Sequence, residues 1–525
     1  MVDRWEVAPK LVVALGVAVA AYVAIGSTVF PQGPDQAIFS WVGTVILDGG
    51  VPYRDAVDIK GPLTFYLYAA VLGVLGRNEF GIRLFDLCVV LGACVMLGRV
   101  TLRLCSGDSL AATCAALFFC LMYYGGGYAD TAEPEGWGGV LILAAVLILM
   151  KPPSNAAFSM SAVGAIIAAA TLIKPTFAAY MVIPCAFGVG GAERRSPPFW
   201  PELACIASFS VVILIAILLL MQAHAFGDLL DTFGYIYSTY EPGGGASWGP
   251  AIHALVKSAL GFGLLIPYIL VPLALWSLRS AAVSREIRLM LSWLAVSTLV
   301  VIIQRRFWHD HCLPVALSLS PFVGVACGYL MVRWPATRSP HNLRSAWVGI
   351  LAVLGTFFPV AKLAVSENSQ WPLYVSGVES KAQYVSDVMK PFNVVKSPFN
   401  YLALKKVSSY IEQSTADSDE LVIWGWDVSI FLMSHRRSAT RFGVFQQLID
   451  SGVLLDKFRA TFISEVSQHR PRYIIVDTRG AWLFDEGTGL KLLKEFPEFD
   501  RLIRSHYTQV AQVDAYQIWR RFGQD

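Results

Sequence analysis

Long apolar runs fill the chain up to about Ser366, whereas the residues beyond it mix polar and apolar positions as a water-soluble domain does. A helix needs roughly 20 apolar residues to cross the hydrocarbon core of a bilayer. The pattern therefore predicts a polytopic bundle of about eleven membrane spans. These spans lie near residues 11–30, 83–103, 109–126, 138–151, 157–173, 176–191, 203–223, 257–278, 289–304, 312–332 and 346–364.

The segment Leu63–Gly76 is apolar but too short to cross the bilayer comfortably, and aromatic rings lie near its start. We read it as a juxtamembrane helix at the membrane interface. With the N-terminus cytoplasmic and this segment not crossing, every inside loop carries basic residues, as the positive-inside rule requires. These residues are Arg99, Arg103, Lys151, Arg194, Arg195, Arg279, Arg285, Arg288, Arg333, Arg338 and Arg344. The C-terminal tail then lies outside the cytoplasm, which in a bacterium is the outer side of the inner membrane.

The C-terminal tail has the pattern of a small α/β domain, in which apolar runs typical of buried strands alternate with stretches of helical periodicity. The expected strands are Leu421–Gly425, Tyr473–Asp477 and a pair within Gln509–Arg520, and the expected helices lie around Tyr401–Gln413 and Leu490–Phe496. The predicted fold is therefore mainly α: a transmembrane helical bundle over residues 1–365, followed by an extracytoplasmic α/β domain over residues 366–525.

Composition agrees with a membrane protein and excludes some partners. Hydrophobic residues make up 55% of the chain and charged residues 15%, against about 25% charged in a typical soluble protein. The formal net charge is only +3 and no basic block is present, so we expect no nucleic-acid partner. The nine cysteines lie in or beside apolar segments without metal-ligand spacing, which is typical of small buried hydrophobic side chains.

The unusual polar residues collect in the loops predicted to lie outside. Charges at the edge of a membrane are costly and tend to be functional. If the helices form a bundle, these loops converge on one outer cavity, where carboxylates serve as a base or hold a divalent metal ion and cations bind phosphate. The candidate acids and histidines are Asp35, Asp58, Glu133, Glu135, His309 and His311, and the candidate phosphate-binding cations are Lys60, Lys174, Arg305 and Arg306.

Each candidate also has a structural alternative. Asp35 follows the first span and Pro34, where it can cap a helix that starts at the membrane surface. Lys60 precedes an interfacial segment and can extend its ammonium group to the interface as a snorkelling residue. Lys174 interrupts an apolar run and can be a helix-end residue. The pair His309 and His311, with Asp310 between them, suggests metal ligation by spacing alone.

Several motifs in a fixed order resemble one family. Asp35 after the first span, IKGPL at Ile59–Leu63 and RLF at Arg83–Phe85 resemble the bacterial GT-C glycosyltransferases related to protein O-mannosyltransferases and to the aminoarabinose transferase of lipid A. The resemblance covers nearly the whole chain. Further matching segments are Thr171–Pro175, Arg305–Pro314 and Trp424–Phe442.

This resemblance implies an inverting sugar transfer from a polyprenyl-phosphate donor at the outer membrane face to a lipid, glycan or protein acceptor. Asp35 is then the base that deprotonates the acceptor hydroxyl, and Lys60 binds the donor phosphate. Glu133 or Glu135 matches the acid of the second loop, and His311 matches a histidine at the start of a late span. Many relatives have Asp-Glu where this chain has Asp35-Gln36, and a tyrosine is common at the position of Cys312.

Two other classes of function compete with this interpretation. A transporter also has many spans, but we find no internal repeat and few ionisable residues deep within the predicted spans, where transporters place their sites. A large outside α/β tail is also atypical of transporters. A non-catalytic scaffold or flippase partner in envelope polysaccharide assembly is the third alternative.

Overall fold

A computed structural model of the chain describes residues 3–150, 155–187, 200–236, 248–279, 283–304, 307–333, 343–389, 401–450, 452–479 and 488–523. The chain folds into two compact units, and each unit is assembled from separated stretches of sequence. We call them the helical unit and the mixed unit. The helical unit comprises Met1–Val29, Ile82–Ala216 and Gly245–Ser369, and the mixed unit comprises Phe30–Gly81, Ile217–Gly244 and Gln370–Asp525.

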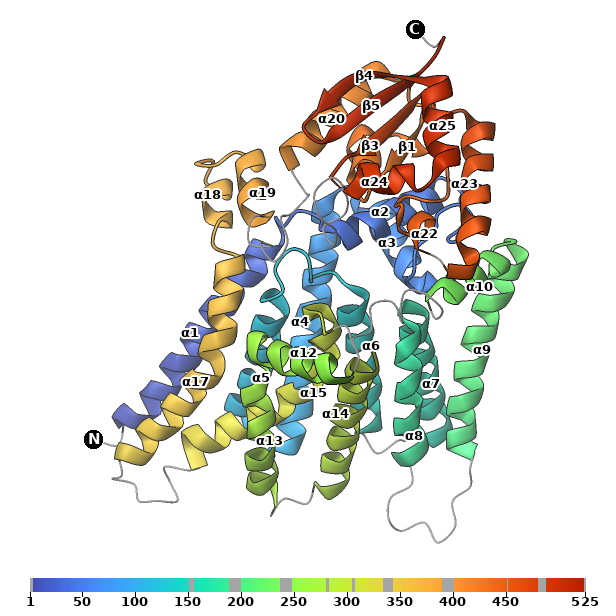
Figure 1. Ribbon diagram of the computed structural model, residues 1–525. Coiled ribbons are helices and arrows are strands. Elements are labelled where there is room, and N and C mark those ends of the chain that lie inside the picture. The colour runs from blue at the N-terminus through green and yellow to red at the C-terminus, as the bar shows by residue number, and fades with distance from the viewer. Residues whose placement is uncertain are drawn as a thin grey trace. The chain divides into compact units, whose positions relative to one another are not determined.

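The helical unit holds the membrane helices (Figure 1). Seven described helices are long and apolar enough to cross a membrane, and shorter apolar helices occupy the predicted spans near 109–126, 138–151, 176–191 and 257–278. The helices are α1 (Asp3–Ser27), α4 (Glu79–Leu104), α5 (Ser109–Tyr124), α6 (Pro134–Leu149), α7 (Ala156–Ile173), η1 (Pro175–Met181), α8 (Val182–Phe187), α9 (Trp200–Gln222), α12 (Trp248–Gly261), α13 (Leu265–Leu278), α14 (Ser284–Gln304), α15 (His309–Gly328), η3 (Tyr329–Arg333) and α17 (Leu343–Glu367).

The predicted span at 257–278 is divided into two helices. Helix α12 ends at Gly261 and α13 begins at Leu265. Gly263 between them has φ +70°, a left-handed conformation that glycine adopts without steric cost. The hydropathy of this segment is continuous, so the break could not be read from the apolar pattern.

Helix α15 forms the centre of the helical unit. Every one of its residues except His311 is buried. Its glycines allow close approach to α5, because a Cβ atom at Gly324 would lie 2.3 Å from the carbonyl oxygen of Ala111, and one at Gly328 would lie 2.9 Å from the Ala111 Cβ. Small residues spaced four apart are the usual means of packing membrane helices closely. His311 is therefore the one residue of this central helix that is partly exposed.

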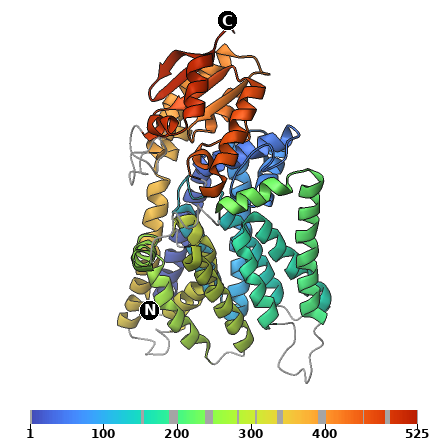
Figure 2. The same cartoon turned by 45° about the vertical axis from the view of Figure 1, so that its right-hand side comes forward.

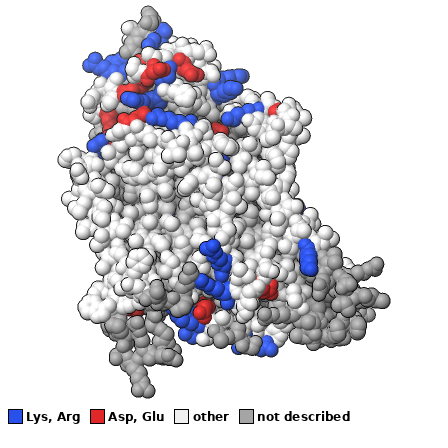
Figure 3. Space-filling view, turned by 180° about the vertical axis from the view of Figure 1, so that it is seen from behind, with Lys and Arg blue, Asp and Glu red and all other residues white. Residues whose placement is uncertain are grey.

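The outer helices present apolar side chains on their exposed faces. On α9, Leu214, Ile215, Leu218 and Leu219 are all more than half exposed. In the view of Figure 3, charged side chains gather over the α/β part of the mixed unit and are sparse along the middle of the membrane helices. Contact with lipid tails is favourable for such an apolar surface, whereas its exposure to water is costly. These features agree with the seven candidate membrane helices and describe a multi-pass membrane protein.

The mixed unit is built on a five-stranded sheet in the order β2-β1-β3-β5-β4 (Figures 1 and 2). Strand β1 pairs in parallel with β2 and β3, and β5 pairs antiparallel with β3 and β4. The predicted strands and helices of the tail are confirmed. The strands are β1 (Glu420–Trp424), β2 (Arg437–Ser438), β3 (Tyr473–Asp477), β4 (Tyr507–Val513) and β5 (Tyr516–Arg521). The helices are α2 (Pro34–Leu47), α3 (Pro62–Leu75), α10 (Phe226–Tyr235), α18 (Trp371–Val375), α19 (Lys381–Met389), α20 (Tyr401–Ser414), α21 (Ser429–Ser434), α22 (Gln446–Ile449), η4 (Gly452–Leu454), α23 (Leu455–His469), α24 (Thr488–Lys494) and α25 (Pro497–His506).

The first predicted outer loop folds with the C-terminal α/β residues. Helices α2 and α3 pack against each other, and α2 also packs against α21. The amide of Val57 donates a hydrogen bond of 2.8 Å to the carbonyl oxygen of Arg441. The Val57 side chain joins the core that contains Trp424, Phe442 and Ile474. The segment that carries Asp35, Asp58 and Lys60 is thus part of the same compact unit as the sheet.

Candidate functional site

The candidate residues form two clusters, one in each unit. The Asp58 cluster, in the mixed unit, contains Asp35, Asp58 and Lys60. The Glu135 cluster, in the helical unit, contains Glu135, Lys174, Asp310 and His311. We describe each cluster by itself.

Asp35 lies in the first turn of α2, directly after Pro34. The N-cap position of this helix is Gly33, so the Asp35 carboxylate lies inside the first turn and not at the cap. An acid in this place interacts favourably with the positive end of the helix dipole. Proline at the first helical position sets this geometry, because its fixed φ suits a helix start. Asp35 is partly exposed.

Asp58 is buried in the loop between α2 and α3, with 6% of its surface exposed. The amide of Lys60 donates to the Asp58 Oδ1 at 3.3 Å. Burial raises the pKa of Asp58 to about 6; the Lys60 charge opposes the rise and the Asp35 charge adds to it. Asp35 therefore lies near enough to influence the protonation of Asp58. Helix α2 and the loop that follows it thus place two acids and one cation close enough for their charges to interact.

Lys60 is held by its neighbours on both its backbone and its side chain. The hydroxyl of the buried Tyr53 donates to the Lys60 carbonyl oxygen at 2.8 Å. The Lys60 ammonium lies 5.7 Å from the centroid of the Phe39 ring, a cation–π contact with α2. Phe39 is one turn beyond Asp35 on the same helix. This contact directs the ammonium group toward the helix that carries the candidate base.

The Glu135 cluster gathers side chains from three separate segments. Glu135 follows Pro134 at the start of α6, Lys174 is the single residue between α7 and η1, and His311 lies in the first turn of α15. Lys174 Nζ forms an ion pair with Glu135 Oε1. His311 Nε2 lies 3.5 Å from the same oxygen and 3.7 Å from Asp310 Oδ2. Three helix starts therefore bring their polar residues to one point.

This arrangement fits a divalent metal ion. Glu135, Asp310 and His311 each offer one ligand atom, and these atoms all lie within 4.8 Å of one another. Two carboxylates and one imidazole suit Zn²⁺ or Mn²⁺ and leave further coordination positions open. Lys174 Nζ pairs with Glu135 Oε1, so a bound ion and the Lys174 ammonium would share the Glu135 carboxylate.

The structure gives the two candidate acids and the two candidate histidines different surroundings. The group of three ligand-bearing residues includes Glu135 and His311. Glu133 is buried at the N-cap position of α6 and makes no capping hydrogen bond with its side chain. His309 is buried edge-on against Phe262, with ring centroids 4.9 Å apart. The predicted cations Arg305 and Arg306 lie outside the described residues.

Two groups of buried polar residues were not singled out from the sequence. Asp86 in α4 accepts hydrogen bonds from Tyr123 and Trp137 in the helical unit. Asp427 and Asp477 are buried beside the ends of β1 and β3 in the mixed unit. The local signal for Asp477 is a carboxylate at the end of the apolar Tyr473–Asp477 run.

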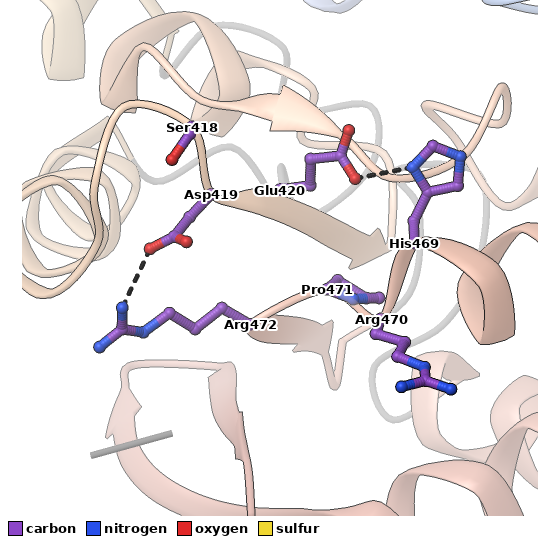
Figure 4. A pocket seen from close by; sticks show the side chains of 7 residues that line it. All are labelled: Ser418, Asp419, Glu420, His469, Arg470, Pro471 and Arg472. Atoms are coloured by element: carbon purple, nitrogen blue, oxygen red, sulfur yellow. Dashed lines mark hydrogen bonds and ion pairs between the residues drawn. The ribbon is translucent and has the colours of Figure 1, made fainter. Parts of the chain in front are cut away.

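A pocket of about 420 Å³ lies at the other end of the parallel strands (Figure 4). Two acidic residues that line the pocket pair with basic residues of the same lining. Glu420 Oε2 lies 2.8 Å from His469 Nδ1, and Arg472 Nη1 lies 3.1 Å from Asp419 Oδ2. These pairs join the start of β1 to the segment before β3. Its remaining lining residues are Ser418, Arg470 and Pro471. We assign the pocket a structural role.

Comparison with known proteins confirms the predicted fold. The structure matches ArnT, the aminoarabinose transferase of Cupriavidus metallidurans, solved bound to undecaprenyl phosphate, with a TM-score of 0.59 and 13% identity over 98% of this chain and 99% of that chain. It also matches the oligosaccharyltransferase of Archaeoglobus fulgidus tethered with an acceptor peptide, with a TM-score of 0.50 and 12% identity over 89% of this chain and 69% of that chain.

A second structure of that oligosaccharyltransferase, AglB in complex with an inhibitory peptide and a dolichol-phosphate, matches with a TM-score of 0.50 and 10% identity over 97% of this chain and 74% of that chain. No family model and no curated protein sequence matches the chain. The chain therefore has the GT-C fold: a mainly helical membrane bundle with a small C-terminal sheet region.

Proposed function

We propose that this protein is a membrane glycosyltransferase that moves a sugar from a polyprenyl-phosphate donor to an acceptor hydroxyl. The observation that carries the proposal is the match over nearly the full length of both chains to ArnT, a transferase solved with undecaprenyl phosphate. The Asp58 and Glu135 clusters support it, because each combines carboxylates with a cation at the start of a helix.

Asp35 is the proposed base. As the acceptor oxygen bonds to the anomeric carbon, its proton passes to the Asp35 carboxylate, and the bond from the anomeric carbon to the phosphate oxygen breaks. The lipid phosphate leaves with the bonding electrons, and a single displacement inverts the anomeric centre. Phosphate is a good leaving group, so one base and cationic stabilisation of the leaving charge are sufficient. Lys60 supplies a positive charge within the same cluster.

Asp58 adjusts the charge around this base. Its raised pKa, about 6, leaves it substantially but not fully ionised near neutral pH. The Asp35 charge adds to the rise in the Asp58 pKa, because two like charges in a partly buried place repel each other.

The Glu135 cluster is the proposed site for the negative charge of the lipid phosphate or for a divalent ion that binds it. A metal ion held there would stabilise phosphate charge as a Lewis acid. Glu135, Asp310 and His311 would be its ligands, and Lys174 would be released to contact phosphate directly. The positive-inside pattern supports a reaction on the outer face of the membrane and an extracytoplasmic α/β region.

The test uses purified protein and a panel of undecaprenyl-phosphate-linked hexoses and pentoses, with envelope lipid and glycan fractions as acceptors. Release of undecaprenyl phosphate is measured by mass spectrometry. We expect wild-type protein to release it and Asp35→Asn to lose turnover by a factor of about a hundred or more, because the amide cannot take the proton. Asp48→Asn, at the other end of α2, is the matched control and keeps wild-type turnover.

Two results would contradict the proposal. Failure of the wild-type protein both to bind undecaprenyl phosphate in native mass spectrometry and to release it from every donor would exclude the transferase. Near-wild-type turnover by Asp35→Asn would leave the transferase intact but return Asp35 to a structural role. The search for the base would then move to Asp58, Glu133 and Glu135.

A further inference from the structure

A buried carboxylate in helix α4 accepts two hydrogen bonds on one oxygen. The Tyr123 hydroxyl donates to Asp86 Oδ1, and Trp137 Nε1 donates to the same atom at 2.8 Å. All three side chains are at most 3% exposed. Removing a carboxylate from water is costly unless its hydrogen bonds are made. An ionisable residue that is buried in a membrane helix is therefore expected to have a function.

The same network fixes the chain just before α6. The Tyr123 hydroxyl accepts a hydrogen bond of 3.0 Å from the amide of Ala132. Ala132 has φ +61°, a backbone conformation that non-glycine residues adopt only when their surroundings impose it. The Tyr123 ring also lies against the first turn of α6, because a Cβ atom at Gly136 would be 2.9 Å from Tyr123 Cε2. Tyr123 thus fixes the position of both Ala132 and the start of α6.

Arg83, one helical turn before Asp86, holds the preceding loop in the same way. Its Nη1 donates to Thr131 Oγ1 at 2.9 Å and to the Thr131 carbonyl at 3.2 Å, and its Nη2 donates to the Tyr128 carbonyl at 2.8 Å. Arg83 is 1% exposed. Helix α4 therefore holds the segment 128–137 at two points. The Arg83 cation binds the loop before α6, and the Asp86 carboxylate binds the first turn of α6.

Glu135 lies within the segment that this network holds. Trp137, which donates to Asp86, is two residues beyond Glu135, and Ala132, which donates to Tyr123, is three residues before it. Pro134 and Gly136 flank Glu135. The position of the Glu135 carboxylate beside Lys174 and His311 therefore depends on where the start of α6 is held.

We propose that Asp86 is a positioning residue that, through Tyr123 and Trp137, fixes the start of α6 so that Glu135 meets Lys174, Asp310 and His311. The proposal rests on the proposed function, in which this cluster receives phosphate charge. Asp86 itself contacts neither Lys174 nor His311 in any hydrogen bond or ion pair that the described part of the chain shows.

The experiment is a double-variant cycle in purified full-length protein, read by melting temperature and by release of undecaprenyl phosphate from the sugar panel. Asp86→Ala removes the shared acceptor, and Glu135→Gln removes the charge that it positions. We expect Asp86→Ala to lower kcat by about tenfold or more. We also expect the melting temperature of the double variant to fall by less than the sum of the two single losses, because coupled sites are not additive.

Two further variants separate positioning from general stability. Asp86→Asn keeps an oxygen that accepts from both donors, so we expect it to recover most of the kcat lost in Asp86→Ala. Thr101→Val is the matched control, because Thr101 is buried in the same helix and bonds only locally, to the Leu97 carbonyl. Its effect should add to that of Glu135→Gln, and its kcat should match wild type.

Each outcome decides a separate point. Additive melting temperatures for Asp86→Ala and Glu135→Gln, or wild-type kcat in Asp86→Ala, would overturn the positioning role. Coupled melting temperatures in a protein that transfers no sugar would keep the positioning role and contradict the proposed function. If Asp86→Ala does not fold, Tyr123→Phe replaces it in the cycle, because it removes the hydroxyl that joins Asp86 to Ala132 and keeps the ring.

Discussion

The rings of Trp41 in α2 and Phe431 in α21 stack with their centroids 6.0 Å apart and their planes at 22°. Gly443 completes this contact, because a Cβ atom there would lie 2.4 Å from Trp41 Cζ3. Trp41 is 3% exposed, so the indole is enclosed by residues of the α/β region. The helix that carries Asp35 is therefore held by the C-terminal residues of the chain.

We expect Gly443→Ala to weaken this contact, because the new methyl group overlaps the indole ring. Overpacking of this kind costs about 1–3 kcal/mol. The free energy of unfolding of the purified protein measures the cost, and Trp41→Leu in the same chain should recover part of it. Gly227→Ala in α10 is the control, since a Cβ atom there meets nothing within 4 Å. Equal stability of Gly443→Ala and Gly227→Ala would contradict the packing argument.

Lys174→Met should destabilise the helical unit strongly. The Glu135 side chain is only 3% exposed and that of Lys174 14% exposed, so the variant leaves a buried carboxylate without its ammonium partner. Breaking one side of a buried pair costs about 3–5 kcal/mol. Thermal unfolding in detergent should show a smaller loss for Lys174→Met combined with Glu135→Gln than for Lys174→Met alone. An equal or larger loss in the double variant would show that the ion pair is not the source of the effect.

Lys60→Ala should raise the KM for the lipid-linked donor, because it removes the positive charge of the Asp58 cluster. Without this charge, which opposes the rise, the pKa of Asp58 should also move further above about 6. Lys457→Ala is the control in the same unit, since Lys457 is exposed and pairs with Asp231 at 2.5 Å, a surface contact of little energetic value. Unchanged donor dependence in Lys60→Ala would remove Lys60 from the mechanism.

Stability of the α/β region should fall as pH rises from about 4 toward neutrality. Burial, and then the neighbouring Asp477 charge, raise the pKa of Asp427, and the Tyr516 hydroxyl and the Arg479 cation face the same pair from β5 and from beyond β3. The folded protein therefore keeps a proton that the unfolded chain releases, so stability is complete below the ordinary aspartate pKa and is lost as pH rises through the raised one.

Asp427→Asn should remove the part of this pH dependence that comes from position 427. The amide oxygen still accepts from Tyr516, and no charge forms at this position at higher pH. Melting temperatures at pH 4 and pH 8 test the prediction: the variant should exceed wild type at pH 8 and equal it near pH 4. A wild-type protein that loses no more stability than the variant from pH 4 to pH 8 would contradict it.

The orientation proposed for the chain has its own test. We expect Arg285 to face the cytoplasm and the C-terminal α/β region to lie outside, because the basic residues then fall on the inside loops. Reporter proteins fused after residues 285 and 525 measure this directly. One of the reporters is active only in the cytoplasm. Activity of this reporter when it is fused after residue 525 would reverse the topology and exclude an outer-face reaction.

Many helices and strands could be predicted from the sequence, because the hydropathy pattern that indicates them is a local property. Each predicted span contains an apolar helix, and the strands of the α/β region follow their apolar runs. The packing of Val57 against the Arg441 segment was not readable, because no local pattern marks a contact between distant parts of a chain. Such contacts depend on the three-dimensional shapes that both segments adopt.

The sequence indicated which residues are candidates for the site better than it indicated which of them lie together. The sequence predicted both Glu133 and Glu135 as second-loop acids, and the structure brings Glu135 to Lys174 and His311. Pro134 held the missing signal, since proline favours the first position of a helix and so places Glu133 at the cap and Glu135 in the first turn. The Asp86 network was not predicted, because hydrogen bonds between separate helices leave no trace in spacing.

The hydrogen bond between Val57 and Arg441 also bears on how the protein is made. Residues 30–81 leave the ribosome early, yet the core that encloses them needs strands β1 and β3. At 5–20 residues per second, the roughly 380 residues between Val57 and Arg441 take on the order of 20–80 seconds to synthesise. During that time Trp41 and Val57 have no α/β core to enter, so the newly made loop exposes apolar side chains that invite aggregation or capture by a chaperone.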